Sequence, residues 1–117
     1  MSYADEYLAR ELAEQGRATP VPPWVRYPDI ERFSIGWRMG SGEGYLHLWG
    51  GWTGTRTHDE LLAYLREFAP IPADFADWAG GLLLPEPCDA HGNPLDWEEA
   101  MDAQADHARA LGLVAPA

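Results

Sequence analysis

Lysine is absent from this sequence of 117 residues, and its eight basic residues are all arginine. Arginine in place of lysine, together with abundant alanine, glycine and proline, is typical of a bacterial genome rich in GC. The single cysteine, Cys88, excludes an internal disulfide framework and is typical of a reducing compartment. The longest aliphatic run, Leu82-Leu83-Leu84, is too short to span a bilayer, and residues 1–15 lack the pattern of an export signal. We therefore expect a cytoplasmic protein.

Basic residues are scarce, and they are unevenly placed. The chain has 19 acidic residues against eight arginines, a formal net charge of −11. From Glu67 onward ten acidic residues face Arg109 alone, a net charge of −9, whereas residues 1–66 carry only −2. A field of this sign repels nucleic acid and anionic membranes and attracts basic partners. Plain solubility is the alternative explanation of the same charge.

The distribution of apolar residues predicts a mostly α fold. With 46% hydrophobic residues the chain can bury a core, and its length suits a compact single domain over 1–117. We expect four to five helices and at most one or two short strands. The predicted elements are a helix over 3–15, an extended Pro-rich segment over 18–29, an aromatic and glycine-rich core segment over 36–52, a helix over 57–68, a short helix over 73–79 and an acidic C-terminal helix over 94–111.

Several boundaries follow from local signals. Ser2 and Thr57 are each followed three residues later by an acid, the capping-box pattern of a helix start. Ser41 is a candidate cap for the helical stripe of the core segment, and Asn93 is a candidate cap for the last helix, with Pro94 at its first position. Residues 30–39 fit a strand and a helix equally well, because their apolar residues match both periods.

One side of the last helix carries a stripe of residues at helical spacing. They are Trp97, Met101, Ala105, Ala108 and Leu111.

A first candidate site lies in the core segment. Arg38 and Glu43 sit among tryptophans, and a structural ion pair that pins the glycine turn is the simpler interpretation. The alternative is a catalytic or ligand-binding set of Arg38, Glu43, His47 and His58 in a Trp-lined pocket. GSGEG at 40–44 lacks the spacing of a phosphate-binding loop, and the histidines show no metal-ligand spacing. We therefore expect no cofactor and no metal.

A second candidate site is the acidic C-terminal half. Carboxylates recur at helical spacing on the last helix, where like charges destabilise an isolated helix unless a partner or the helix N-terminus compensates. Aromatic side chains that stay exposed would serve as anchors; Trp24, Tyr27, Trp78 and Trp97 are the candidates. The predicted partner-binding residues are Asp74, Asp77, Trp78, Asp96, Glu98, Glu99, Asp102 and Asp106.

Three functional hypotheses remain open at this point. The first is a small acidic protein-binding protein of immunity, antitoxin or inhibitor type, whose partner is a basic toxin or a nucleic-acid enzyme, with no direct contact to nucleic acid or membrane. The second is a small enzyme or ligand-binding module around Arg38, Glu43 and His47. The third is a scaffold subunit that forms a homo-oligomer through its aromatic surface.

Overall fold

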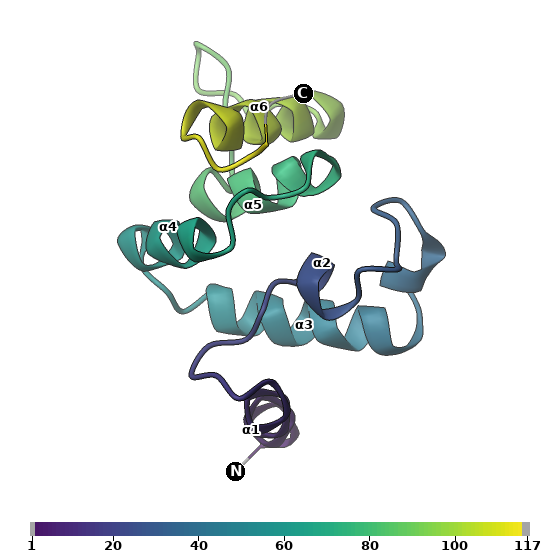
Figure 1. Ribbon diagram of the computed structural model, residues 1–117. Helices are drawn as coiled ribbons and strands as arrows, with labels where there is room; N and C mark the ends of the chain where they lie inside the picture. Colours follow the sequence, from purple (N-terminus) through teal and green to yellow (C-terminus); the bar gives the residue numbers. More distant parts are fainter. Residues whose placement is uncertain (1, 116–117) are drawn as a thin grey trace. The chain divides into compact units, whose positions relative to one another are not determined.

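The computed structural model describes residues 2–115 and confirms the mostly α fold (Figure 1). No strand is assigned among these residues, which contain two isolated β-bridges instead. Residues 2–115 form six α-helices, where four to five were predicted, together with two short 3-10 helices. In chain order the elements are α1 (Tyr3–Gln15), α2 (Pro23–Arg26), η1 (Ile35–Trp37), α3 (Gly40–Thr53), α4 (His58–Glu67), η2 (Ala73–Phe75), α5 (Ala76–Leu83) and α6 (Trp97–Ala110).

The chain forms two compact units, Met1–Thr55 and Arg56–Ala117. The first contains α1, α2, η1 and α3, and the second contains α4, η2, α5 and α6. The single domain over 1–117 stays a prediction. Among the helices of residues 2–115, none has both the length and the apolar character that a membrane crossing requires.

Helix α1 has the predicted bounds because both of its ends are specified locally. The Ser2 hydroxyl accepts a hydrogen bond from the Asp5 backbone N–H at 3.1 Å, and the Asp5 carboxylate accepts one from the Ser2 N–H at 3.4 Å. At the other end Gly16 adopts a left-handed conformation with φ 65°, which glycine enters without steric cost.

We predicted that the Pro-rich segment is extended throughout. This prediction is wrong in part, because one helical turn, α2, interrupts the segment at Pro23–Arg26. Pro23 occupies the first position of this turn, where a missing N–H costs nothing. Trp24 is buried and packs edge-on against Trp49, with ring centroids 5.7 Å apart. Because Trp24 is buried, it is not one of the exposed anchors for which it was a candidate.

Residues 30–39 form neither of the two predicted structures. They contain two turns and the 3-10 helix η1, which begins where the Ser34 hydroxyl accepts a hydrogen bond from the Gly36 N–H at 3.0 Å. The Trp37 indole N–H donates to the Glu31 carbonyl at 2.9 Å and closes the segment on itself. These local hydrogen bonds replace the ladder that a strand would need from a neighbouring strand.

Helix α3 carries the core segment. Its N-cap is Met39 rather than the predicted Ser41, and its first residue, Gly40, follows directly. Tyr45 and Trp49 of the predicted stripe are buried, whereas Leu48 and Trp52 are half-buried.

A close approach explains one glycine of α3. A Cβ at Gly42 would lie 2.2 Å from the Gly36 carbonyl oxygen, so η1 and α3 pack closer than any side chain would allow.

In the second unit, α4 follows the predicted capping box. The Thr57 hydroxyl accepts from the Glu60 N–H at 3.1 Å, and the Glu60 carboxylate accepts from the Thr57 N–H at 2.8 Å. The predicted short helix at 73–79 is longer than expected: the 3-10 helix η2 leads directly into α5, which continues to Leu83.

The core of the second unit is built where α5 and α6 pack side by side (Figure 1). Gly80 on α5 meets the backbone of Gln104 on α6 so closely that a Cβ would lie 1.7 Å from the Gln104 carbonyl oxygen. The Gln104 side chain in turn donates to the Leu84 carbonyl at 3.0 Å, which satisfies an acceptor at the C-terminal end of α5. The two helices are therefore held by backbone contact and by one side-chain cap.

Helix α6 begins three residues later than predicted. Asp96, not Asn93, is its N-cap, and its carboxylate accepts from the Glu99 N–H at 2.8 Å. After α6 the chain returns alongside the segment between α4 and η2, where the Ile71 N–H donates to the Leu113 carbonyl at 2.8 Å. Both of these residues are buried.

Candidate functional site

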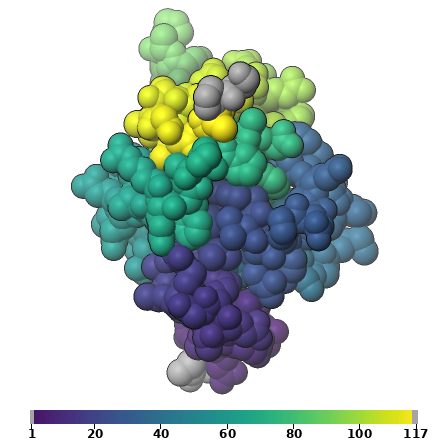
Figure 2. All heavy atoms as spheres, in the orientation of Figure 1, coloured from purple at the N-terminus to yellow at the C-terminus, as the bar shows by residue number. Residues whose placement is uncertain are grey.

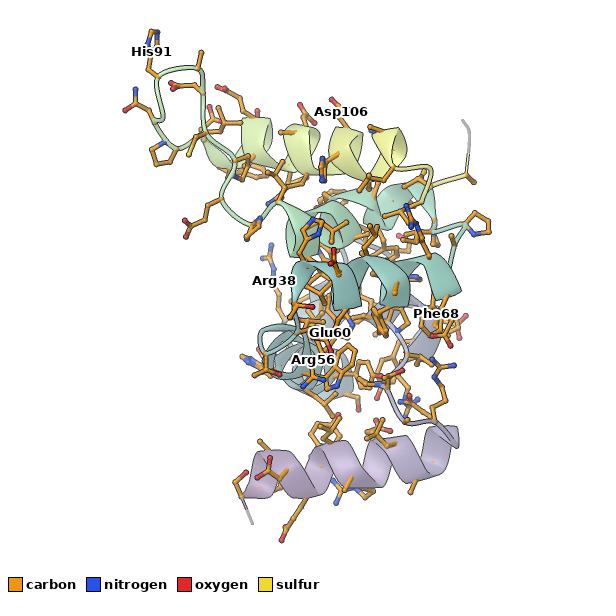
Figure 3. The ribbon with its side chains drawn as sticks, turned by 90° about the vertical axis from the view of Figure 1, so that its left-hand side faces the viewer. Arg38, Arg56, Glu60, Phe68, His91 and Asp106 are labelled. Carbon is orange, nitrogen blue, oxygen red and sulfur yellow. The ribbon has the colours of Figure 1, made fainter. Side chains whose placement is uncertain are left out.

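Helix α6 presents a row of exposed carboxylates on the side that does not pack against α5. Asp106 points away from α5 in Figure 3, and its carboxylate accepts from the Arg109 guanidinium at 3.1 Å. We call the following exposed set the acidic face: Asp96, Glu98, Glu99, Asp102 and Asp106. The structure thus places these five predicted partner-binding residues on one helix and its cap.

The other three predicted residues do not belong to this face. Asp74 is exposed but lies on η2, whereas Asp77 on α5 is buried, with 8% of its surface exposed. Trp78 is half-buried and packs against Phe75 with ring centroids 5.2 Å apart. A buried carboxylate and a packed indole serve the core of the unit, and sequence spacing alone did not separate them from surface residues.

Trp97 is the aromatic residue of the last helix that was named as a candidate anchor if exposed. In the structure 70% of its surface is exposed. Trp97 adjoins Asp96 and Glu98 in the chain, so a large apolar side chain lies within the acidic face.

The loop before α6 is an ordered hairpin-like turn. Cys88 and Pro94 form an antiparallel bridge, and the Asp89 N–H donates to the Asn93 carbonyl at 2.8 Å. The Asp89 carboxylate accepts from the backbone N–H groups of His91 at 2.8 Å and Asn93 at 3.0 Å. His91 lies at the tip of this loop (Figure 3), which projects from the second unit in the space-filling view (Figure 2).

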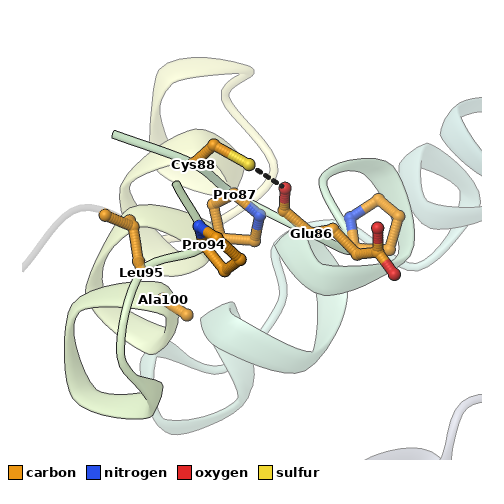
Figure 4. Close-up of a pocket in the computed structure, with 7 residues that line it drawn as sticks. Glu86, Pro87, Cys88, Pro94, Leu95 and Ala100 are labelled. Carbon is orange, nitrogen blue, oxygen red and sulfur yellow. Dashed lines mark hydrogen bonds between the residues drawn. The ribbon is translucent and has the colours of Figure 1, made fainter. Parts of the chain in front are cut away.

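Between this loop and the first turns of α6 there is a surface hollow of about 360 Å³ (Figure 4). Its wall is mostly apolar, and we call it the proline hollow. It is lined by Pro85, Glu86, Pro87, Cys88, Pro94, Leu95 and Ala100. Pro94, Leu95 and Ala100 were predicted within the last helix, and no hollow was predicted here; the three prolines within ten positions were the only signal of a rigid wall.

The carboxylates at the start of α6 are electrostatically crowded. The pKa of Asp96 is lowered, first by its hydrogen bond from the Glu99 backbone N–H. The pKa of Glu99 is raised, first by its hydrogen bond with the Asp96 carboxyl group and then by the negative charges of Asp96 and Asp89. Asp89 itself keeps a lowered pKa because the N–H groups of Asn93 and His91 stabilise its charge. Acids of the loop and of α6 therefore share one negative field.

The residues of the alternative catalytic set are divided between the two units. Arg38, Glu43 and His47 are exposed in the first unit, while His58 is exposed in the second. The predicted ion pair between Arg38 and Glu43 is not formed in the described chain, and neither residue lines the proline hollow. Over residues 2–115 no group of three or more His, Cys, Asp or Glu side chains is arranged to hold a metal ion.

A buried polar network in the first unit was missed by sequence reasoning. Glu11 of α1 is buried, and its Oε1 accepts from the Arg26 guanidinium at 3.2 Å. Burial opposes the charge of Arg26, but the hydrogen bond and charge of Glu11 outweigh it and raise the pKa of Arg26. The Tyr45 hydroxyl donates to the Val21 carbonyl at 2.6 Å and accepts from the Gln15 side chain at 3.0 Å. These contacts tie α1, the Pro-rich segment and α3 together.

The network makes the stability of the first unit sensitive to high pH. Burial raises the pKa of Tyr45 to about 12, whereas an unfolded tyrosine ionises near 10. Its contribution to the free energy of unfolding is therefore complete below pH 10 and is lost as the pH rises from 10 to 12. A shift of this size corresponds to about 2 to 3 kcal/mol.

This loss can be measured by urea unfolding at several pH values between 9 and 12. Tyr45→Phe should be less stable at neutral pH, because the Val21 carbonyl loses its donor, but its stability should fall less steeply across this window. Equal slopes for both proteins would contradict the assignment of the pH dependence to Tyr45.

Comparison with known proteins gives no match to a family model, to a curated protein or to a solved structure.

Proposed function

We propose that this is a small cytoplasmic protein-binding protein, of immunity, antitoxin or inhibitor type, that docks its acidic C-terminal half on a basic protein. The partner would be a cationic toxin or a nucleic-acid enzyme, whose phosphate-binding surface is positively charged. One observation carries the proposal: Trp97 is 70% exposed in the middle of exposed carboxylates. Protein interfaces combine a few large anchors, often tryptophan, with charged rims that accelerate and select the encounter.

The charge of the second unit supports the same proposal. Residues 56–117 carry twelve acidic residues and three arginines, a net charge of −9, against seven acidic residues and five arginines in residues 1–55. In α6 only Arg109 offsets the acids, and its guanidinium contacts Asp106 alone among them. A basic partner would relieve this repulsion, which folding by itself leaves in place.

The decisive experiment captures the partner from the native host with the wild-type protein and with the triple variant Glu98→Lys, Asp102→Lys and Asp106→Lys. We expect the wild type to retain a basic protein, identified by mass spectrometry, and the triple variant to lose it. The affinity for the purified partner should fall steeply with salt, because the attraction is largely electrostatic.

A matched control shows whether binding depends on where the acidic residues lie or only on the net charge of the protein. Glu6→Lys, Glu14→Lys and Glu43→Lys reverse three exposed acids of the first unit and change the net charge by the same amount. This control should keep the partner. If both triple variants bind it equally well while circular dichroism shows them folded, the acidic face is not the docking surface.

A further inference from the structure

The proline hollow is large enough to serve as a socket that admits one long side chain. Its volume of about 360 Å³ lies at the lower end of the range for small-ligand pockets. Pro87 on one side and Leu95 on the other are linked by a backbone hydrogen bond of 3.1 Å, from the Leu95 N–H to the Pro87 carbonyl. The bridge between Cys88 and Pro94 fixes the same two stretches further along (Figure 4). The socket is therefore preformed, so an occupant pays little to order it.

The chemistry around the socket selects a cation. Glu86 is part of the wall, and its side chain is exposed. The field of Asp89, Asp96 and Glu99 lies at the same junction of loop and helix, since Asp89 and Asp96 both raise the pKa of Glu99. Trp97 precedes Ala100, a wall residue, by one helical turn and offers an exposed ring to a cation.

We propose that the proline hollow receives an arginine side chain of the basic partner. The three-carbon stem lies against the prolines and Leu95, and the guanidinium remains at the mouth, where it pairs with the Glu86 carboxylate and reaches the ring of Trp97. Arginine fits better than lysine, because its planar, weakly hydrated group stacks on rings and pairs with carboxylates through two hydrogen bonds. This inference rests on the proposed function and specifies where, next to the acidic face, a side chain of the partner is bound.

The test uses hexa-arginine as the probe, with hexa-lysine and hexa-citrulline as matched peptides that change the head group and remove the charge. Binding to the full-length protein is followed by backbone amide shifts in nuclear magnetic resonance. We expect hexa-arginine to shift the amides of Glu86, Cys88, Leu95 and Ala100, hexa-lysine to bind about fivefold more weakly, and hexa-citrulline not to bind.

Two variants address the hollow itself. Ala100→Leu narrows it without changing the charge and should weaken hexa-arginine binding about tenfold. Glu86→Gln removes one carboxylate and should weaken it about three- to fivefold. Ala110→Leu makes the same change at an exposed position at the end of α6 and should leave binding unchanged. Because Glu86 is exposed, its variant remains informative if Ala100→Leu fails to fold.

The outcomes are distinguishable. If the three lysine substitutions at 98, 102 and 106 abolish hexa-arginine binding while both hollow variants bind normally, the socket is wrong and the proposed function stands. Equal binding of hexa-lysine, or binding of hexa-citrulline, overturns the choice of arginine. If hexa-arginine does not bind at all, the socket is also overturned, and the captured partner alone then decides on the proposed function.

Discussion

Gly80→Ala should destabilise the second unit by about 3 kcal/mol or more. The added methyl carbon would lie 1.7 Å from the Gln104 carbonyl oxygen and 2.5 Å from its carbonyl carbon. Both atoms belong to the backbone of α6, so no side-chain rotation relieves the overlap and the helices must separate. Separation would also lengthen the hydrogen bond from the Gln104 side chain to the Leu84 carbonyl. Urea unfolding followed by circular dichroism and tryptophan fluorescence measures the loss.

The neighbouring glycine provides the control for this prediction. At Gly81 a Cβ would meet only the flexible side chain of Gln104 at 3.5 Å, an ordinary contact. Gly81→Ala should therefore be neutral, or stabilise α5 by about 0.5 to 1 kcal/mol through helix propensity. If both substitutions had the same effect on the free energy of unfolding, the close packing of α5 on α6 would not be a source of stability.

Arg26→Met should destabilise the first unit by about 2 to 4 kcal/mol. Glu11 has a side chain only 5% exposed, and its Oε2 already lies buried without a hydrogen-bond partner. Removing Arg26 takes the donor from Oε1 as well and leaves a charged carboxylate in the interior. The Arg26 side chain is 31% exposed, so water entering its place keeps the loss below that of a fully buried pair.

Two further variants separate charge from packing. Arg38→Met makes the same substitution at an exposed arginine of the same unit and should change the free energy of unfolding by less than about 0.5 kcal/mol. Glu11→Leu combined with Arg26→Met removes both charges and should recover most of the stability lost with Arg26→Met alone. A double variant that is less stable than Arg26→Met would show that the pair contributes through packing, not through the compensation of a buried charge.

Short-range sequence patterns were sufficient to predict where a helix begins when both partners of the capping interaction lie within one helical turn. The hydroxyl of Ser2 or Thr57 meets a backbone N–H three residues later whatever the rest of the chain does, and α1 and α4 begin where these patterns predicted. For residues 30–39 short-range patterns did not predict the structure, because the apolar residues fitted the periods of a strand and of a helix equally well. The outcome depended on hydrogen bonds that the spacing of apolar residues does not encode, such as that from Trp37 to Glu31.

Of the candidate site, only the negative charge could be predicted from the sequence. The sequence placed the carboxylates of the last helix at helical spacing, and α6 does present Glu98, Asp102 and Asp106 to solvent. It did not predict that Asp77 would be buried, or that the loop prolines and Ala100 would enclose a hollow. These outcomes depend on which residues distant in the chain meet, and periodicity along one element carries no information on its neighbours.

By itself the sequence determined the helical character of this protein, the starts of α1 and α4 and the negative charge of its C-terminal half, since all three depend on composition or on residues a few positions apart. The tertiary structure decided which of these residues face solvent. Trp97 became exposed and Glu11 buried because the packing of α6 on α5 and of α1 on the Pro-rich segment fixes where each helix face points. Whether a residue is buried depends on both of the surfaces that pack together, and the sequence of one segment specifies only one of these surfaces.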